Sequence, residues 1–234
     1  MTGFQIFKAE AGLRFVFNRV LPSFPGAGTE TFTRLCEAME PFGLTVDGIS
    51  VPQPFPSRLN ESILEFNLLS GKAVLKVGFG SLELIFKPLT SSDAEIAALL
   101  FEAASRAVLG DWEGTLKSPI LRITYTSHLE LASPETVEAF LLAHLSEAPE
   151  NSGLQRDAVQ YVGFSNSESD GPQVKRITFA KSVLKDSALF FECFLEYAPA
   201  FAPANLISRA REEITTILTL FGLARTEPPP EATQ

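Results

Sequence analysis

Apolar and polar side chains alternate in several short runs of this sequence, and a period of two is typical of β-strands. The first run covers residues 13–18, with Leu13, Phe15 and Phe17 on one face. Three more runs follow close together, with apolar side chains at Leu64, Phe66 and Leu68, at Leu75, Val77 and Phe79, and at Leu82, Leu84 and Phe86. Short turns at Ser70-Gly71 and Gly80-Ser81 separate these runs, which predicts an antiparallel meander.

Two helices are expected around this meander. Thr29 is a candidate N-cap for a helix that ends near Gly43. Ser92 and Glu95 form a capping box at the start of a second helix, and Gly110 follows its last apolar position. Residues 1–115 therefore predict one β-α-β-β-β-α unit.

The same order begins again at residue 116. A strand over residues 121–131 opens with the pair Leu121-Arg122, as the first strand opens with Leu13-Arg14. Ser133 and Pro134 then start a helix, and Pro203 or Asn205 starts the last helix, which ends at Gly222. Between these helices lie three strand-like runs, at residues 159–164, 174–181 and 188–197.

The predicted fold class is thus α+β, built from two tandem β-α-β-β-β-α units at residues 1–115 and 116–223. We expect one compact domain with a pseudo-twofold axis, antiparallel pairing and the helices packed on one side. Whether the units form one sheet or two is left open. Residues 224–234, with a run of three prolines, predict a disordered tail.

The charge and the cysteine content of the chain narrow its possible partners and its cellular compartment. The chain has 234 residues and a net charge of −9, which disfavours binding to nucleic acid or to an anionic membrane surface. Cys36 and Cys193 both fall in apolar patterns and are expected to be free thiols. Residues 1–17 lack the apolar core of a signal peptide, and no stretch is apolar enough to span a membrane. These features predict a cytoplasmic protein.

One segment of the second unit resembles a known family. The run from Arg122 to Leu129, with Tyr125 and His128, is similar to a Thr-Tyr-x-Asn-His-like run in a sporadically distributed family of uncharacterised bacterial proteins. Ser127 stands where that family has Asn. The meander at residues 61–87 and the helix at residues 206–221 also resemble the layout of that family, so the resemblance covers most of the chain. It implies no activity.

The sequence offers little for catalysis or metal binding. Its two histidines and two cysteines lack the spacing of a zinc site, and no glycine-rich phosphate loop occurs. Residues 166–171 imitate the start of a calcium loop, but Ile177 occupies the twelfth position, where a carboxylate ligand is required. We therefore predict no metal, no cofactor and no catalytic residue.

The polar faces of the two opening strands carry the candidate ligand site. If these strands are neighbours, Arg14 and Arg122 share one surface and can bind an anionic ligand, with His128 as a titratable partner. The predicted ligand-binding residues are Arg14, Arg122, Thr124, Thr126 and His128. The simpler alternative is a solvated sheet face, which shows the same alternation.

A second candidate surface is aromatic. Phe190 and Phe194 share one face of the run at residues 188–197 with charged neighbours, which predicts that something covers them. Either a second copy of the chain or the proline-rich loop with Phe55 could do so. Phe190, Phe194 and Phe55 are therefore the predicted interface residues.

Three classes of function follow from these surfaces. The first is a non-enzymatic interaction or regulatory protein that binds a protein partner or forms a homodimer through a sheet face or aromatic patch. The second is a domain that binds a small anionic ligand at the pseudo-twofold axis. The third is an enzyme of an unrecognised type. The scarcity of polar clusters favours the first class.

Overall fold

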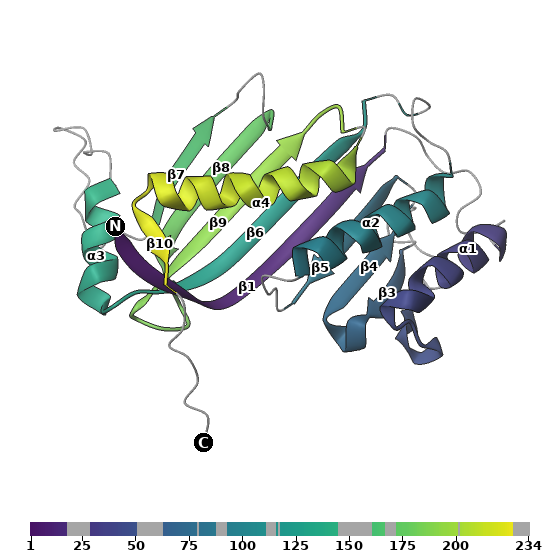
Figure 1. Cartoon of the computed structure of the whole chain (residues 1–234), viewed down its shortest axis with the longest axis horizontal. Helices are drawn as coiled ribbons and strands as arrows, with labels where there is room; N and C mark the ends of the chain where they lie inside the picture. The colour runs from purple at the N-terminus through teal and green to yellow at the C-terminus, as the bar shows by residue number, and fades with distance from the viewer. Residues whose placement is uncertain are drawn as a thin grey trace, which may run out of the picture.

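The computed structural model describes residues 1–17, 29–50, 63–78, 80–87, 93–110, 116, 118–144, 161–166, 172–200 and 202–226. It has the α+β architecture that the sequence predicts, with ten strands in a single sheet (Figure 1). The question of one sheet or two is thereby resolved in favour of one.

The helices and strands follow the predicted order. The first half contains β1 (Thr2–Val16), α1 (Thr29–Met39), β2 (Ile49–Ser50), β3 (Leu64–Leu68), β4 (Ala73–Val77), β5 (Ser81–Phe86) and α2 (Asp93–Leu109). The second half contains β6 (Ile120–Glu130), α3 (Pro134–His144), β7 (Tyr161–Asn166), β8 (Val174–Lys181), β9 (Ala188–Tyr197), α4 (Pro203–Leu220) and β10 (Leu223–Arg225). Short 3-10 turns lie at Glu40–Phe42, Val46–Gly48 and Leu69–Gly71.

The strand order reads the same outward from the β1–β6 boundary. The sheet runs β2-β3-β4-β5-β1-β6-β9-β8-β7. The first-half meander therefore continues from β1 through β5, and the second-half meander continues from β6 through β9. Every neighbouring pair along this path is antiparallel, as predicted. A common origin of the two halves stays a prediction.

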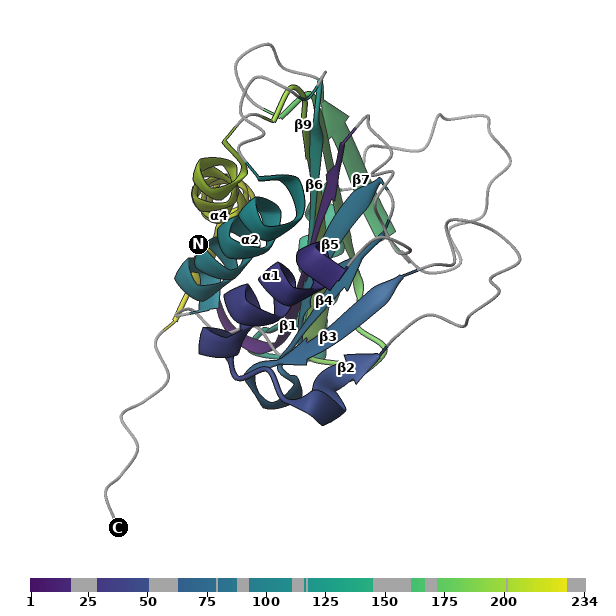
Figure 2. The same cartoon turned by 90° about the vertical axis from the view of Figure 1, so that its right-hand side faces the viewer.

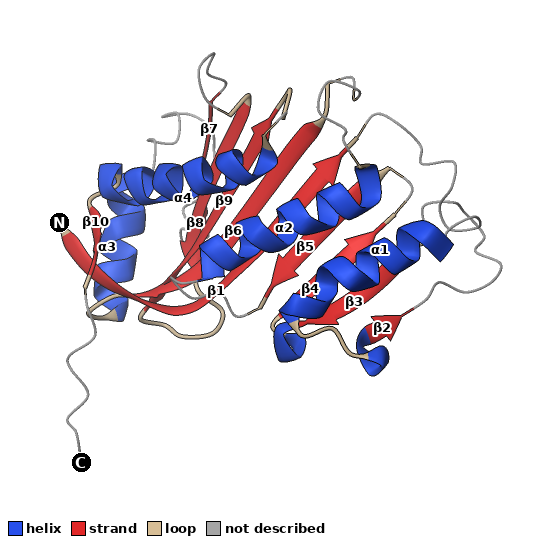
Figure 3. Ribbon diagram, turned by 45° about the vertical axis from the view of Figure 1, so that its right-hand side comes forward, coloured by secondary structure: helices blue, strands red, loops and turns tan. Residues whose placement is uncertain are grey.

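The described helices cover one face of the sheet. Helices α1, α2 and α4 form a layer on that side (Figure 2), and they run obliquely across the strands (Figure 3). Helix α3 joins the same core because Phe140 packs edge-on against the buried Phe179 of β8, with ring centroids 5.1 Å apart. On the α2 side, Phe15 and Phe101 make a similar edge contact at 5.9 Å. The opposite side of the sheet, which carries Arg14 and Arg122 among others, is called the open face below.

Helix ends follow the predicted glycines. Gly110 and Gly222 have φ values of 63° and 74°, the left-handed region in which glycine avoids a steric penalty. Ser133 accepts a hydrogen bond from the backbone N–H of Thr136 at 3.4 Å, as an N-cap does. Ser92 lies outside the described residues. No helix in the described part of the chain is long and apolar enough to span a membrane.

Strand β1 is much longer than the predicted run at residues 13–18. It begins at Thr2 and pairs with β6 along most of its length. A bulge between Ile6 and Lys8 shifts the register, so the helix-facing side chains change from even positions such as Phe4 to odd positions such as Leu13. That change of phase hid the first part of the strand in the alternation pattern.

Three other segments differ from expectation. Strand β2 was not among the strand-like runs of the sequence. Strand β7 begins and ends two residues later than the predicted run at residues 159–164. Strand β10 pairs in parallel with Thr2, Gly3 and Phe4, so ordered structure extends past residue 224, where the tail was expected to begin.

Candidate ligand-binding site

Four of the five predicted ligand-binding residues line one hollow at the centre of the open face. They are Arg14, Arg122, Thr124 and Thr126. The antiparallel register of β1 and β6 places Arg14 opposite Arg122 and Gly12 opposite Thr124. The two opening strands are therefore neighbours, and these four polar residues lie on one surface.

The hollow has a volume of about 410 Å³ and sits over Gly12. Ile85 of β5 and Phe194 of β9 flank it, since Ile85 pairs with Gly12 and Phe194 pairs with Thr124. The two arginines line one end, while Glu10 and Thr126 line the other. Glu83 and Ala11 complete the lining.

The hollow lies over Gly12, and the fold itself does not require a glycine at this position. Its φ is not among the positive values of the chain, and a Cβ atom at this position would meet nothing within 4 Å. A glycine in a strand interior destabilises the protein by about 0.5–1 kcal/mol relative to alanine. Such glycines often mark a place where a ligand approaches the backbone closely.

The second half of the chain has a large side chain at the matching position. Gly12 comes two residues before Arg14, and Ile120 comes two residues before Arg122. Because β1 and β6 are antiparallel, Ile120 lies on the other side of the arginine pair, opposite Val16. The open face is therefore recessed on one side of the arginines and carries two aliphatic side chains on the other.

Charges alternate along one row of the open face, except at the arginine pair. Strand pairing places six charged residues side by side across the sheet, in the order Glu65, Lys76, Glu83, Arg14, Arg122 and Glu196. Like charges directly opposite each other on neighbouring strands are destabilising. The arginine pair is the one step in this row where equal charges meet.

The two arginines differ in their partners. Arg122 donates from Nε to Oε2 of Glu196 at 2.7 Å, and the Glu196 side chain is 19% exposed. Arg14 is exposed and forms no ion pair with any residue that the structure describes. Arg14 is therefore the arginine of this pair whose charge remains available to a ligand.

Glu10 at the opposite end is held by two lysines. Lys8 Nζ lies 3.0 Å and Lys87 Nζ lies 3.5 Å from its carboxylate oxygens. The hydrogen bond from Lys8, together with the charges of both lysines, lowers the pKa of Glu10 against the effect of burial. Glu10 is thus a stable anion near neutral pH.

His128, the fifth predicted residue, lies outside the lining of the hollow. Its Nδ1 is 2.8 Å from the Ser182 hydroxyl, and its ring centroid is 5.3 Å from that of Phe190. Burial lowers the pKa of His128, as does the charge of Lys8, while Glu10 raises it. The imidazole is therefore held in a structural contact beside the bulge of β1.

The predicted aromatic surface is partly covered by the chain itself. Arg176 lies over the ring of Phe194, with its guanidinium carbon 4.5 Å from the centroid, and His128 lies beside Phe190. Both phenylalanines are half-buried. Phe55, the third predicted interface residue, lies outside the described residues.

Metal ligands do not gather in the described part of the chain, where no cluster of three or more His, Cys, Asp or Glu side chains occurs. Both cysteines are free thiols. Burial raises the pKa of Cys193 to about 12, so this thiol is a poor nucleophile at neutral pH.

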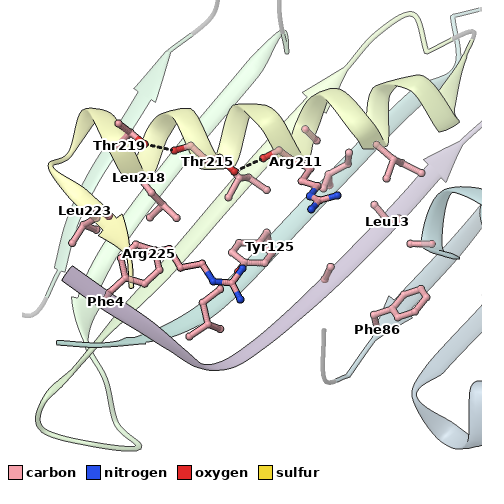
Figure 4. A pocket seen from close by; sticks show the side chains of 18 residues that line it. Phe4, Leu13, Phe86, Tyr125, Arg211, Thr215, Leu218, Thr219, Leu223 and Arg225 are labelled. Atoms are coloured by element: carbon pink, nitrogen blue, oxygen red, sulfur yellow. Dashed lines mark hydrogen bonds between the residues drawn. The ribbon is translucent and has the colours of Figure 1, made fainter. Parts of the chain in front are cut away.

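A second space, on the helix side of the sheet, was not predicted. A cavity of about 610 Å³ lies between α4, α2 and the strands β1, β6 and β10. Figure 4 shows the side chains of the 18 residues that line it. Ala11, Ala97 and Ala210 come from three different elements, and their small side chains leave this space open. The sequence alone does not show that these alanines line one cavity.

No protein-family model matches this chain, and a search of curated proteins finds no match either. The resemblance to a family of bacterial proteins therefore stays a prediction.

Proposed function

We propose that this protein is a non-enzymatic binding protein that holds a small carboxylate in the hollow over Gly12. The observation that carries the proposal is Gly12 itself. This glycine keeps a recess open next to two arginines, although neither its backbone conformation nor its neighbours require a glycine.

The arginine pair supports an anionic group on the ligand. A carboxylate placed beside Arg14 and Arg122 would restore the alternation of charge that the row across the open face lacks at this step. Guanidinium groups bind carboxylates through short, charge-assisted hydrogen bonds. The exposed Arg14 can reorient toward a ligand without first breaking an ion pair to a described residue.

The flanks of the hollow support an apolar body on the same ligand. Ile85 and Phe194 face the space over Gly12 from opposite sides. Thr124 and Thr126 add hydroxyl groups, which can donate or accept hydrogen bonds. A flat ring that carries one carboxylate matches this combination of groups.

Binding without catalysis is supported by the titratable groups of the hollow. Among the described lining residues these groups are arginines and glutamates, and the lowered pKa of Glu10 makes it a weak general base. His128 makes its polar contact with Ser182 instead. Free thiols at Cys36 and Cys193 support the proposal that the protein works in the reducing cytoplasm.

Benzoate titrated into protein labelled with nitrogen-15 tests this proposal. We expect the amide signal of Gly12 to shift with benzoate and to shift much less with benzyl alcohol, which has a similar ring and no charge. Gly12→Ile fills the hollow and Arg14→Gln removes the available charge, so each should weaken benzoate binding by about tenfold or more.

Matched controls come from the same face. Val16→Ile enlarges a side chain on the other side of Arg14, and Lys76→Gln removes a charge from the same row, so both variants should keep the affinity of the wild type. Equal affinity of wild type and Gly12→Ile for benzoate, or the absence of any shift at Gly12 in the wild type, would refute the proposal.

A protein partner or a second copy of the chain could use the same face. The half-buried Phe190 and Phe194 support this candidate, because no described helix covers them. Light scattering after size-exclusion chromatography tests it. A dimer that Phe194→Ser dissociates supports an interface here, and a monomer at all concentrations counts against a homodimer.

A further inference from the structure

We infer that the cavity beneath α4 is a second binding site, which takes a fatty acid with its hydrocarbon chain inside and its carboxylate between Arg211 and Arg225. The site lies on the opposite side of the sheet from the hollow over Gly12. It is independent of the function proposed above.

The interior of the cavity is apolar. Helix α4 contributes Ile207, Ile214 and Leu218, and the strands contribute Leu13 and Ile123, among other side chains. Pockets that bind small molecules commonly have volumes of about 300–1,000 Å³ and bury most of the ligand, so a cavity of about 610 Å³ falls within the usual range. None of the described residues that line it has an acidic side chain, so none of them would repel an anionic head group.

Two arginines mark where the head group would lie. Arg211 extends from α4 toward the strands, and Arg225 extends from β10 toward Tyr125 (Figure 4). Both arginine residues are exposed, whereas Leu218 and Leu223 beside them are buried. The cavity therefore has a cationic mouth and an apolar interior, which is the polarity of an anionic amphiphile.

Tyr125 adds a hydroxyl donor at this mouth. Burial raises the pKa of Tyr125, and the nearby Ser127 hydroxyl and Arg225 guanidinium offset part of that effect. The phenol therefore keeps its proton near neutral pH and can donate a hydrogen bond to a carboxylate. The Ser127 hydroxyl, two residues along the same strand, is fully buried and makes no hydrogen bond to a described residue.

The other polar side chains at the mouth already have partners. Thr215 donates to the backbone carbonyl of Arg211, and Thr219 donates to that of Thr215, both at 3.0 Å. Both threonine hydroxyl groups are therefore used in hydrogen bonds within α4. Among the described lining residues, Arg211, Arg225 and Tyr125 are the donors that remain for a head group.

Calorimetric titration with decanoate, decanol and butyrate separates the contributions of head group and chain. Decanoate should bind at one site per chain, about tenfold or more tighter than decanol, because only the carboxylate pairs with the arginines. Butyrate should bind far more weakly, since its chain buries fewer methylene groups. Equal affinity for decanoate and decanol would overturn the anionic head group, and the absence of decanoate binding would overturn the site.

Variants locate the site. Arg211→Gln and Arg225→Gln should each weaken decanoate binding about tenfold, while Arg106→Gln, an exposed arginine on α2, should change nothing. Ala210→Leu fills the interior, and Thr215→Phe blocks the mouth from an exposed position on α4. Both should abolish binding, and full decanoate affinity in a folded Thr215→Phe protein would contradict the location.

Gly12→Ile keeps the two proposed sites distinguishable. This variant should lose benzoate and keep decanoate, whereas Thr215→Phe should lose decanoate and keep benzoate. Loss of both ligands in either variant would show that they share one site, which would overturn the inference.

Discussion

Arg14 and Arg122 lie directly opposite each other on adjacent antiparallel strands, and each has a glutamate on its outer side. Only the pair of Arg122 with Glu196 closes to 2.7 Å. The two arginines therefore make different contributions to stability, although they occupy matching positions in the two halves of the chain.

Replacing Arg14 and replacing Arg122 should change the free energy of unfolding in opposite directions. Arg14→Gln relieves a repulsion between like charges and should raise the free energy of unfolding by a few tenths of a kcal/mol at low salt. Arg122→Gln removes the partner of the partly buried Glu196 and should lower it. Urea denaturation at low and high salt measures both effects, and stabilisation by Arg122→Gln would contradict this view of the pair.

Gly12→Ala should stabilise the protein while it impairs binding at the hollow. The new methyl group meets no neighbour within 4 Å, so the gain from reduced flexibility of the unfolded chain should be about 0.5–1 kcal/mol. Urea denaturation gives the stability, and the benzoate titration gives the affinity. Gly43→Ala is the contrasting control, because Gly43 has a φ of 74° and should lose stability. A destabilised Gly12→Ala protein would mean that the fold itself requires this glycine.

The ion pair between Lys72 and Asp93 should matter more than exposed pairs do. Lys72 Nζ lies 2.7 Å from Oδ1 of Asp93, whose side chain is only 3% exposed. Asp93→Asn should cost about 1–3 kcal/mol, because a buried ionic hydrogen bond is lost. Glu102→Gln breaks the exposed pair of Glu102 with Arg106 on the same helix and should cost about 0.5 kcal/mol or less. Similar costs for both variants would contradict this prediction.

His128 should make the protein less stable in mild acid. Its pKa in the folded protein is lowered, first by burial and then by Lys8. As the pH falls through about 6.5, the unfolded chain takes up a proton that folded His128 resists. The contribution of His128 to the free energy of unfolding is therefore fully present above that pH. It declines below it, until the pKa of His128 in the folded protein is reached. Melting temperatures between pH 8 and 5.5 should fall less in His128→Gln than in the wild type, and an equal fall in both would rule out this role.

The alternation of side chains was sufficient to predict β8 and β9, because both strands keep one phase from end to end. It failed in β1, where the bulge near Phe7 reverses the phase and Gly12 interrupts the pattern. Strand β10 was not predictable, since three residues carry no periodic signal and its pairing depends on β1 across the length of the chain.

Part of the candidate site was predictable from the sequence. The shared Leu-Arg start of the two opening strands indicated that Arg14 and Arg122 belong together. The register between β1 and β6, which places Gly12 beside this pair, depends on tertiary pairing. The position of His128 beside Ser182 likewise depends on the turn between β8 and β9, which no local pattern specifies.

The contrast between Gly12 and Ile120 has a consequence for stoichiometry. An assembly of two identical chains about an exact twofold axis repeats every recess, so it offers two sites of a kind or none. Here the two matching strands belong to one polypeptide, so the residues at their matching positions can differ. This molecule therefore presents a single recess beside its central arginines, and one chain should take up one carboxylate there.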